Sequence, residues 1–475
     1  MPPEDSKHHH SPTGSNPPAG TNDSIDLTED IGPDTSTPEG RSMIRKATAA
    51  SAMGNMTEWF DYGVYSVAVT YITLHFFPGE YGRILTLATL ALSFVVRPLG
   101  GLVWGPLGDR LGRKAVLTMT ILMMSGATFL IGVLPTFQSV GLLAPILLIL
   151  LRMVQGFSTG GEYGGAATFM AEYAPDKKRG FFGSFLEFGT LGGFALGAAV
   201  MLVFQLLLPE DAMNAWGWRI PFMLALPMGL VGLYLRSKLE DTPVFQELEE
   251  RGEVEESNSM KALVTQYWRP MLIMFGLVAC LNMVNYTLLS YMPTYLESQL
   301  GLDSNLSLIV IIVGEVAMMA VIPFAGRLSD KVGRKPMWLT SVIGLFIFAL
   351  PMFWLMGKSF GLAILGFAVL GLLYIPQLAT ITATFPAMFP SQVRFAGFAI
   401  TYNVATALLG GTAAMVNEAV IEGTGFVLFP AVYMMIAAVF GVIAVKFMTE
   451  TAGASLRGTD VPDSHDTGIL ADEAS

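Results

Sequence analysis

The sequence predicts an all-α membrane protein with twelve transmembrane helices arranged as two homologous six-helix halves. Hydrophobic residues make up 52% of the chain and charged residues 14%, whereas soluble domains carry about 25% charge. A glycine-and-charge segment at 105–114 returns at 326–335, where Asp330 follows Asp109 by 221 residues. Each copy separates two apolar runs. Duplicated hydrophobic halves are typical of secondary transporters.

Apolar runs long enough to span a bilayer, about 20 residues each, occur twelve times. They lie near 47–76, 84–107, 115–134, 143–172, 181–207, 217–236, 270–297, 306–325, 336–355, 360–387, 396–420 and 428–448. The predicted division is therefore a disordered acidic tail (1–40), an N-terminal half (41–236), a middle loop (237–269), a C-terminal half (270–449) and an acidic tail (450–475).

Lysine and arginine are distributed unevenly between the two sides of the predicted bundle. With the N-terminus inside, 21 of them fall in inner segments, and only Arg83, Arg219 and Lys358 fall in outer ones. The positive-inside rule therefore places both termini and the middle loop in the cytoplasm. The net charge of -11 comes from the two tails, which hold -7 and -5.

The residues needed for several other classes of function are scarce. Cys280 is the only cysteine, and of the five histidines only His75 lies near an apolar run. We expect no metal site, no cofactor and no disulfide framework. Without a phosphate-binding loop or nucleotide domain, an enzyme is not expected. The expected partners are a small-molecule substrate and the lipid bilayer, and no nucleic acid; the oligomeric state stays open.

Several segments carry a family resemblance. The repeated loop and the segment 152–156 (RMVQG) resemble signatures of the major facilitator superfamily, over residues 41–450. The segments 54–65 (GNMTEWFDYGVY), 155–163 (QGFSTGGEY) and 171–180 (AEYAPDKKRG) are similar to the metabolite:proton symporters, and most to the bacterial proline/glycine betaine transporters. The resemblance implies a bacterial inner-membrane protein that works by alternating access. The short tail 450–475 lacks the apolar heptads of a coiled coil.

The two copies of the loop are candidates for conformational gating. Glycine lets helices approach closely there, and the charges can bind neighbouring helix ends. The residues concerned are Asp109, Arg110 and Arg113 in the first copy and Asp330, Lys331 and Arg334 in the second.

Ionisable residues inside the apolar runs indicate function, because a charge at bilayer depth is costly. The first half contains Glu58, Asp61, Arg97, Arg152, Glu162 and Glu187, and the second contains Glu315. At about 1.5 Å per residue, Glu58 and Arg152 both reach the midplane. We expect Asp61, Glu58, Arg152 and Glu162 to serve proton coupling, with Asp61 favoured as the carrier. Structural ion pairing is the alternative.

Two further hypotheses concern the other membrane charges. Arg97, Glu162 and Glu187 reach similar depths in the inner half and could form an inner gate network. The role of Glu315 is open, and one option is a pair with a polar group of the eleventh helix.

A pocket for a quaternary ammonium needs aromatic faces, and its carboxylate needs a cation. The predicted substrate-binding residues share helical faces near the midplane. They are Glu58, Trp59, Tyr62, Tyr65, Arg152, Gln155, Asn282, Asn285, Tyr286, Tyr374 and Asn403.

The resulting functional hypothesis is proton symport of small zwitterionic osmolytes such as glycine betaine, proline or ectoine. The alternative within transport is a carboxylate such as 2-oxoglutarate, citrate or shikimate. Because membrane acids outnumber membrane bases, that alternative is less favoured. A nutrient sensor without transport is a remote third option, since neither tail nor loop is long enough for a signalling domain.

Overall fold

A computed structural model describes residues 36–111, 113–160, 162–236, 263, 265–390 and 393–456, and these ranges are helical with short connections. The elements of the N-terminal half are α1 (Pro38–Val67), α2 (Val69–Phe76), α3 (Gly82–Leu111), α4 (Arg113–Val133), α5 (Phe137–Val140), α6 (Leu143–Thr159), α7 (Glu162–Tyr173), η1 (Asp176–Lys178), α8 (Arg179–Leu207), α9 (Glu210–Ala215), η2 (Gly217–Arg219) and α10 (Ile220–Arg236). Those of the C-terminal half are α13 (Trp268–Asn285), η3 (Tyr286–Tyr291), α14 (Met292–Ser298), α15 (Ser304–Val332), α16 (Arg334–Met356), α17 (Phe360–Leu378), α18 (Ile381–Thr384), η4 (Pro386–Met388), α19 (Arg394–Ala405), η5 (Thr406–Gly410), α20 (Ala413–Thr424) and α21 (Phe429–Phe447).

Each of the twelve predicted spans corresponds to one helix or to consecutive helices. Within the described residues, nine helices are long and apolar enough to cross a membrane. The first, third and sixth predicted runs are not among these nine helices. The α1 segment carries buried acids, the described apolar part of α4 is Thr118–Val133, and α10 has 17 residues. The all-helical, twelve-span prediction is confirmed.

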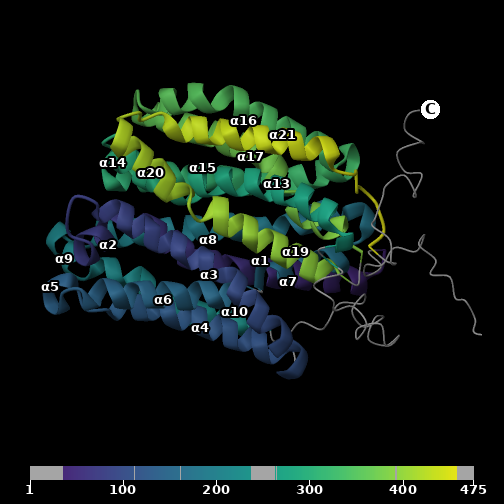
Figure 1. Ribbon diagram of the computed structural model, residues 1–475, viewed down its shortest axis with the longest axis horizontal. Coiled ribbons are helices and arrows are strands. Elements are labelled where there is room, and N and C mark those ends of the chain that lie inside the picture. Colours follow the sequence, from purple (N-terminus) through teal and green to yellow (C-terminus); the bar gives the residue numbers. More distant parts are fainter. Residues whose placement is uncertain are drawn as a thin grey trace, which may run out of the picture.

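The two halves lie side by side and interlock along their length. Figure 1 shows α16 and α21 on one flank and α4 and α6 on the other, with α1, α8, α19 and α13 between them. Across the interface α8 packs on α15, α3 on α19 and α20, and α1 on η3. Most of the buried apolar side chains of both halves form one continuous core. A site between the halves is therefore enclosed by elements of both.

Four of the spans are interrupted, three of them near their middle and Phe360–Thr384 close to its end. The α6–α7 rod breaks at Gly160, and α17–α18 breaks at Ala379 and Thr380. The segments η3 and η5 are single π-helical turns. Such turns occur mostly at functional sites, because they free backbone groups and re-aim side chains. The turns η5 and η3 lie against each other, since a Cβ atom on Gly410 would lie 2.8 Å from the Tyr286 ring.

Close backbone contact places α6 against α3. A Cβ atom on Gly156 would lie 1.8 Å from the Ser93 carbonyl oxygen, so only glycine fits. Small residues allow such helix contacts in membranes. The contact lets Arg152 Nη2 of α6 donate to Ser93 Oγ of α3 at 3.3 Å, and it sets Arg97 opposite Gly160.

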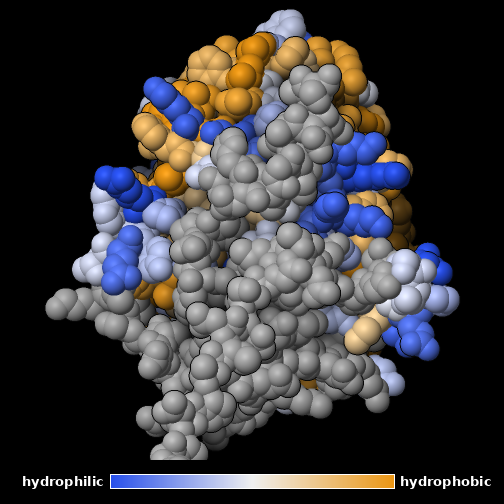
Figure 2. Space-filling view, turned by 90° about the vertical axis from the view of Figure 1, so that its right-hand side faces the viewer, coloured by the Kyte–Doolittle hydropathy of each residue, from blue (hydrophilic) through white to orange (hydrophobic). Residues whose placement is uncertain are grey.

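The molecule has two chemically different ends, which we name by their residues. The signature end comprises 176–181, 326–335, 386–390, 393–394 and 450–456, and the opposite end comprises 66–83, 205–219, 297–304 and 418–428. Figure 2 looks at the signature end, where hydrophilic side chains stand out against apolar flanks. Exposed apolar side chains on those flanks, such as Phe324 and Phe346, suit contact with lipid.

Candidate functional site

The predicted membrane charges of the first half lie buried near the centre of the bundle. Glu58 and Asp61 come from one face of α1, Arg97 from α3 and Arg152 from α6. Each of these four side chains is at most 3% exposed. Charges so deeply buried require compensation from neighbouring groups, and they find it in two separate arrangements.

The first arrangement links Arg152 to Asp61 through two neutral side chains. Arg152 Nη1 donates to Gln155 Oε1 (2.8 Å), and Gln155 Nε2 donates to Thr128 Oγ1. Thr128 Oγ1 in turn donates to Asp61 Oδ2 at 2.8 Å. We call Arg152, Gln155, Thr128 and Asp61 the relay. It connects a guanidinium to a carboxylate without direct contact between them.

The second arrangement joins Arg97 to Glu58 and Tyr62. Arg97 Nη2 lies 3.9 Å from Glu58 Oε1, which is an ion pair but too long for a hydrogen bond. The same nitrogen donates to Tyr62 Oη at 2.9 Å. The guanidinium also lies over the rings of Tyr62 and Phe94, 5.1 and 4.8 Å from their centroids.

Sequence reasoning found these charges but assigned their neighbours differently. It set Glu58 opposite Arg152 because both reach the midplane, whereas Arg97 is the ion-pair partner of Glu58. It also missed Thr128. A hydroxyl in the apolar run of α4, following Thr120 and Ser125, was the available signal.

Of the suggested inner gate network of Arg97, Glu162 and Glu187, the described hydrogen bond and ion pair of Arg97 are with Tyr62 and Glu58, and the contacts of Glu187 are with other residues. Glu187 accepts from Tyr163 Oη (2.5 Å) and Thr190 Oγ1 (3.0 Å), which both belong to the N-terminal half. Glu162 begins α7 and lines a small cavity that Glu58 also lines.

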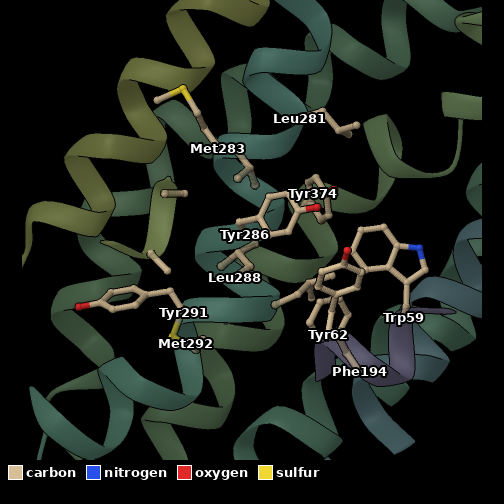
Figure 3. Close-up of a cluster of buried hydrophobic side chains, with 14 of the residues drawn as sticks. Trp59, Tyr62, Phe194, Leu281, Met283, Tyr286, Leu288, Tyr291, Met292 and Tyr374 are labelled. Carbon is tan, nitrogen blue, oxygen red and sulfur yellow. The ribbon is translucent and has the colours of Figure 1, made fainter. Parts of the chain in front are cut away.

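Aromatic rings from both halves surround the central charges. The Trp59 ring lies 5.5 Å from Tyr62, 5.6 Å from Phe194 and 6.3 Å from Tyr286. Figure 3 shows Trp59, Tyr62 and Tyr286 beside one another, with Phe194 below Trp59 and Tyr374 next to Tyr286. Two further rings, Tyr163 and Tyr402, stack across the halves at 4.6 Å. We call Trp59, Tyr62, Phe94 and Tyr286 the aromatic cluster.

Tyr65, predicted to bind substrate, lies against Arg152. Its hydroxyl donates to the Thr86 carbonyl at 3.0 Å, and Arg152 lies over its ring at 4.1 Å. The structure therefore places Tyr65 beside Arg152 of the relay.

The predicted polar residues of the second half are central and already bonded. Asn282 Nδ2 donates to Thr406 Oγ1 (2.7 Å), and Asn285 Oδ1 accepts from Tyr374 Oη (2.9 Å). Asn403 Nδ2 donates to the Gly160 carbonyl of the other half at 2.6 Å. These bonds hold the interrupted helices in place around the site.

In the second copy, one of the residues predicted to serve gating bonds to the other half. Asp330 accepts from the backbone N–H groups of Gly180 (2.7 Å) and Phe181 (2.9 Å), at the N-terminus of α8 in the other half. Arg334 Nη2 holds the same carboxylate at 2.8 Å, and Lys331 is exposed. The side chains of Asp109, Arg110 and Arg113, in the first copy, lie outside the described residues.

A segment after the last helix also takes part in this gate, although sequence reasoning assigned it to a tail. Glu450 accepts from the backbone N–H groups of Arg334 and Lys335 at the N-terminus of α16. Arg179 Nη1 donates to the Ala454 carbonyl, and Arg394 Nη2 donates to the Leu456 carbonyl. Residues 450–456 therefore bridge both halves at the signature end.

The halves are also bonded at the opposite end, which the sequence did not reveal. Arg83 of α3 forms an ion pair with the buried Glu418 of α20 at 2.9 Å. Thr70 donates to Glu297 (2.9 Å), and Gln205 donates to Ser304 (3.1 Å). With contacts between the halves at both ends, the described residues enclose the central site on both sides. An acid within the apolar run 396–420 was the signal for Glu418.

Glu315 stands apart from these arrangements. It is fully buried in α15, and within the described part of the chain neither carboxyl oxygen has a hydrogen-bond partner. The suggested pair with the eleventh helix is therefore not formed.

Comparisons with known proteins agree with this architecture. Residues 51–415 match the model of the Major Facilitator Superfamily. A glycine betaine/proline/ectoine/pipecolic acid transporter, OusA, of Dickeya dadantii is 42% identical over 427 residues, 87% of this chain and 85% of that protein. An ectoine/proline transporter of Corynebacterium glutamicum is 40% identical, over 88% of this chain and 86% of its own.

A solved structure supports the fold. The proton:xylose symporter XylE, bound to 6-bromo-6-deoxy-D-glucose, superposes with a TM-score of 0.70 at 20% identity. The match covers 88% of this chain and 98% of the symporter. The family model and the two similar transporters show that the chain belongs to the major facilitator superfamily.

Proposed function

We propose that this membrane transporter imports small zwitterions, such as glycine betaine, proline or ectoine, together with protons. The observation that carries the proposal is the enclosed central site, where buried acids, buried arginines and aromatic rings from both halves meet. The lysine and arginine distribution supports a signature end that faces the cytoplasm, with both termini on that side.

The charge content of the site supports a zwitterion rather than a carboxylate. A carboxylate substrate needs a surplus of cations, but Arg97 and Arg152 are accompanied by Glu58 and Asp61. The aromatic cluster offers ring faces that attract an ammonium without requiring hydrogen bonds. The two similar transporters are named for betaine, proline or ectoine, which are zwitterions of this kind.

The relay supplies a physical route for proton coupling through Asp61. An ionised Asp61 accepts the Thr128 hydroxyl hydrogen. A protonated Asp61 can donate to the same oxygen, and the Thr128 hydrogen then turns to the Met124 carbonyl, 3.0 Å away. Protonation therefore reverses one hydrogen bond and leaves Arg152 without an anion at the end of the relay. In this scheme Glu58 faces the substrate's cationic group.

The test is uptake into proteoliposomes of radiolabelled glycine betaine, proline, ectoine and 2-oxoglutarate, with and without an imposed proton gradient. We expect gradient-driven accumulation of one or more zwitterions and none of 2-oxoglutarate. Accumulation of 2-oxoglutarate alone would support the carboxylate alternative. Equal zwitterion uptake with and without the proton gradient would refute the proton coupling.

A further inference from the structure

Arg97 has hydrogen-bond donors at the centre of the site that no described residue uses. Its side chain is fully buried, and its Nε and Nη1 atoms have no hydrogen-bond partner among the described residues. Only Nη2 is bonded, to Tyr62. A buried guanidinium with two unused nitrogens is costly unless an anion binds it.

A second unused donor lies beside Arg97, on the other half of the protein. The Tyr286 hydroxyl is buried and has no hydrogen-bond partner within the described ranges. Its ring contacts Phe94 (4.8 Å), and the Arg97 guanidinium lies over the same Phe94 ring. In Figure 3 Tyr286 lies next to Tyr62, whose hydroxyl accepts from Arg97. The unused donors of the two halves therefore share one neighbourhood.

Arg152, the cation that sequence reasoning assigned to the substrate carboxylate, is engaged elsewhere. Its Nη1 and Nη2 donate to Gln155 and Ser93, and its guanidinium lies over Tyr65. It belongs to the relay. For Arg97, in contrast, the ion-pair partner within the described ranges is Glu58, at 3.9 Å.

We propose that Arg97 is the anchor for the substrate's carboxylate and that the Tyr286 hydroxyl completes this subsite. The inference rests on the proposed function, since it assumes a substrate with a carboxylate. Charged hydrogen bonds from Arg97 orient the carboxylate toward α3, so the ammonium lies over the remaining rings of the aromatic cluster. Because Arg97 belongs to the first half and Tyr286 to the second, one carboxylate joins both halves.

The experiment measures equilibrium binding to the purified full-length protein, by isothermal calorimetry with glycine betaine and by competition with choline. Choline shares the quaternary ammonium but lacks the carboxylate. We expect Arg97→Gln to weaken betaine binding by at least about tenfold, as loss of a charged hydrogen bond predicts, without weakening choline. Tyr286→Phe removes one hydrogen bond to the charged carboxylate and should also weaken betaine binding by about tenfold.

Two matched variants serve as controls. Arg269→Gln removes a guanidinium at the exposed start of α13, and Tyr433→Phe removes a hydroxyl bonded to Leu409. Neither should change betaine affinity. Melting curves establish that Arg97→Gln is folded before binding is compared.

The outcomes separate the anchor from the function on which it rests. Betaine affinity within about twofold of wild type in folded Arg97→Gln would overturn the anchor, because a lost charged hydrogen bond costs more. An equal loss for betaine and choline would overturn it as well. If the wild type binds 2-oxoglutarate and no betaine, the proposed function fails. In that case the affinity of Arg97→Gln for 2-oxoglutarate is measured instead. A loss of at least about tenfold supports Arg97 as the carboxylate anchor, and a smaller loss overturns it.

Discussion

Replacing Asp330 by Asn should open the signature end. The carboxylate accepts two backbone N–H groups at the N-terminus of α8, from Gly180 at 2.7 Å and Phe181 at 2.9 Å. Hydrogen bonds to a charged group contribute about 1 kcal/mol more than neutral ones, and the helix N-terminus favours the negative charge. The neutral amide should therefore lose about 2 kcal/mol in the closed state. That corresponds to about a 30-fold shift in the equilibrium toward an open signature end.

The assay is the distance between spin labels on the two halves, measured by double electron–electron resonance. Lys177 and Lys331 are exposed on opposite halves of this end, and each can be replaced by a labelled cysteine after Cys280→Ser. We expect Asp330→Asn to enrich the longer distance and to slow transport, while substrate still binds. Asp303→Asn, which changes an exposed cap at the opposite end, is the matched control.

An unchanged distance distribution in Asp330→Asn would refute the gate, as would loss of binding with unimpaired exchange. Gly180→Ala gives an independent steric check. Its Cβ atom would lie 2.5 Å from the Gly326 carbonyl oxygen of the other half, so the closed contact must widen. It should favour the open state in the same labels.

Three further predictions concern coupling, stability and orientation. Asp61→Asn should abolish accumulation driven by a proton gradient while counterflow continues, because exchange does not require the empty carrier to reorient; Glu58→Gln should instead weaken substrate binding. If both variants still concentrate substrate, the proton route lies elsewhere. Glu315→Met should raise the melting temperature in detergent by removing a buried carboxyl without a hydrogen-bond partner, a gain of about 1–3 kcal/mol; a lower melting temperature would show that the carboxyl has a role. In a Cys280→Ser background, single cysteines at Gln138 and Glu253 should react with impermeant reagents from outside and inside respectively, and reversed labelling would contradict the orientation.

The sequence by itself determined the class of fold and the identity of the charged residues at its centre. Apolar runs of fixed length predict spanning helices because unpaired backbone groups cannot stand in lipid. The recurrence of 105–114 at 326–335 predicted the duplicated halves. Glu58, Asp61, Arg97 and Arg152 were identifiable because a charge inside an apolar run is too costly to be incidental. The depth of each charged residue in the membrane could also be predicted, because each helical residue rises by about 1.5 Å.

Only the tertiary structure decided which of these residues meet. Depth along a helix comes from residue number, but the neighbours of a side chain depend on how each helix is rotated and which helices pack together. The rotation and packing of the helices place Glu58 next to Arg97, and they link Arg152 to Asp61 through Thr128. They also joined Arg83 to Glu418, 335 residues away in the chain. Residues 450–456 had no apolar period to reveal them, because they are held by backbone carbonyls and one carboxylate rather than by a buried helical face.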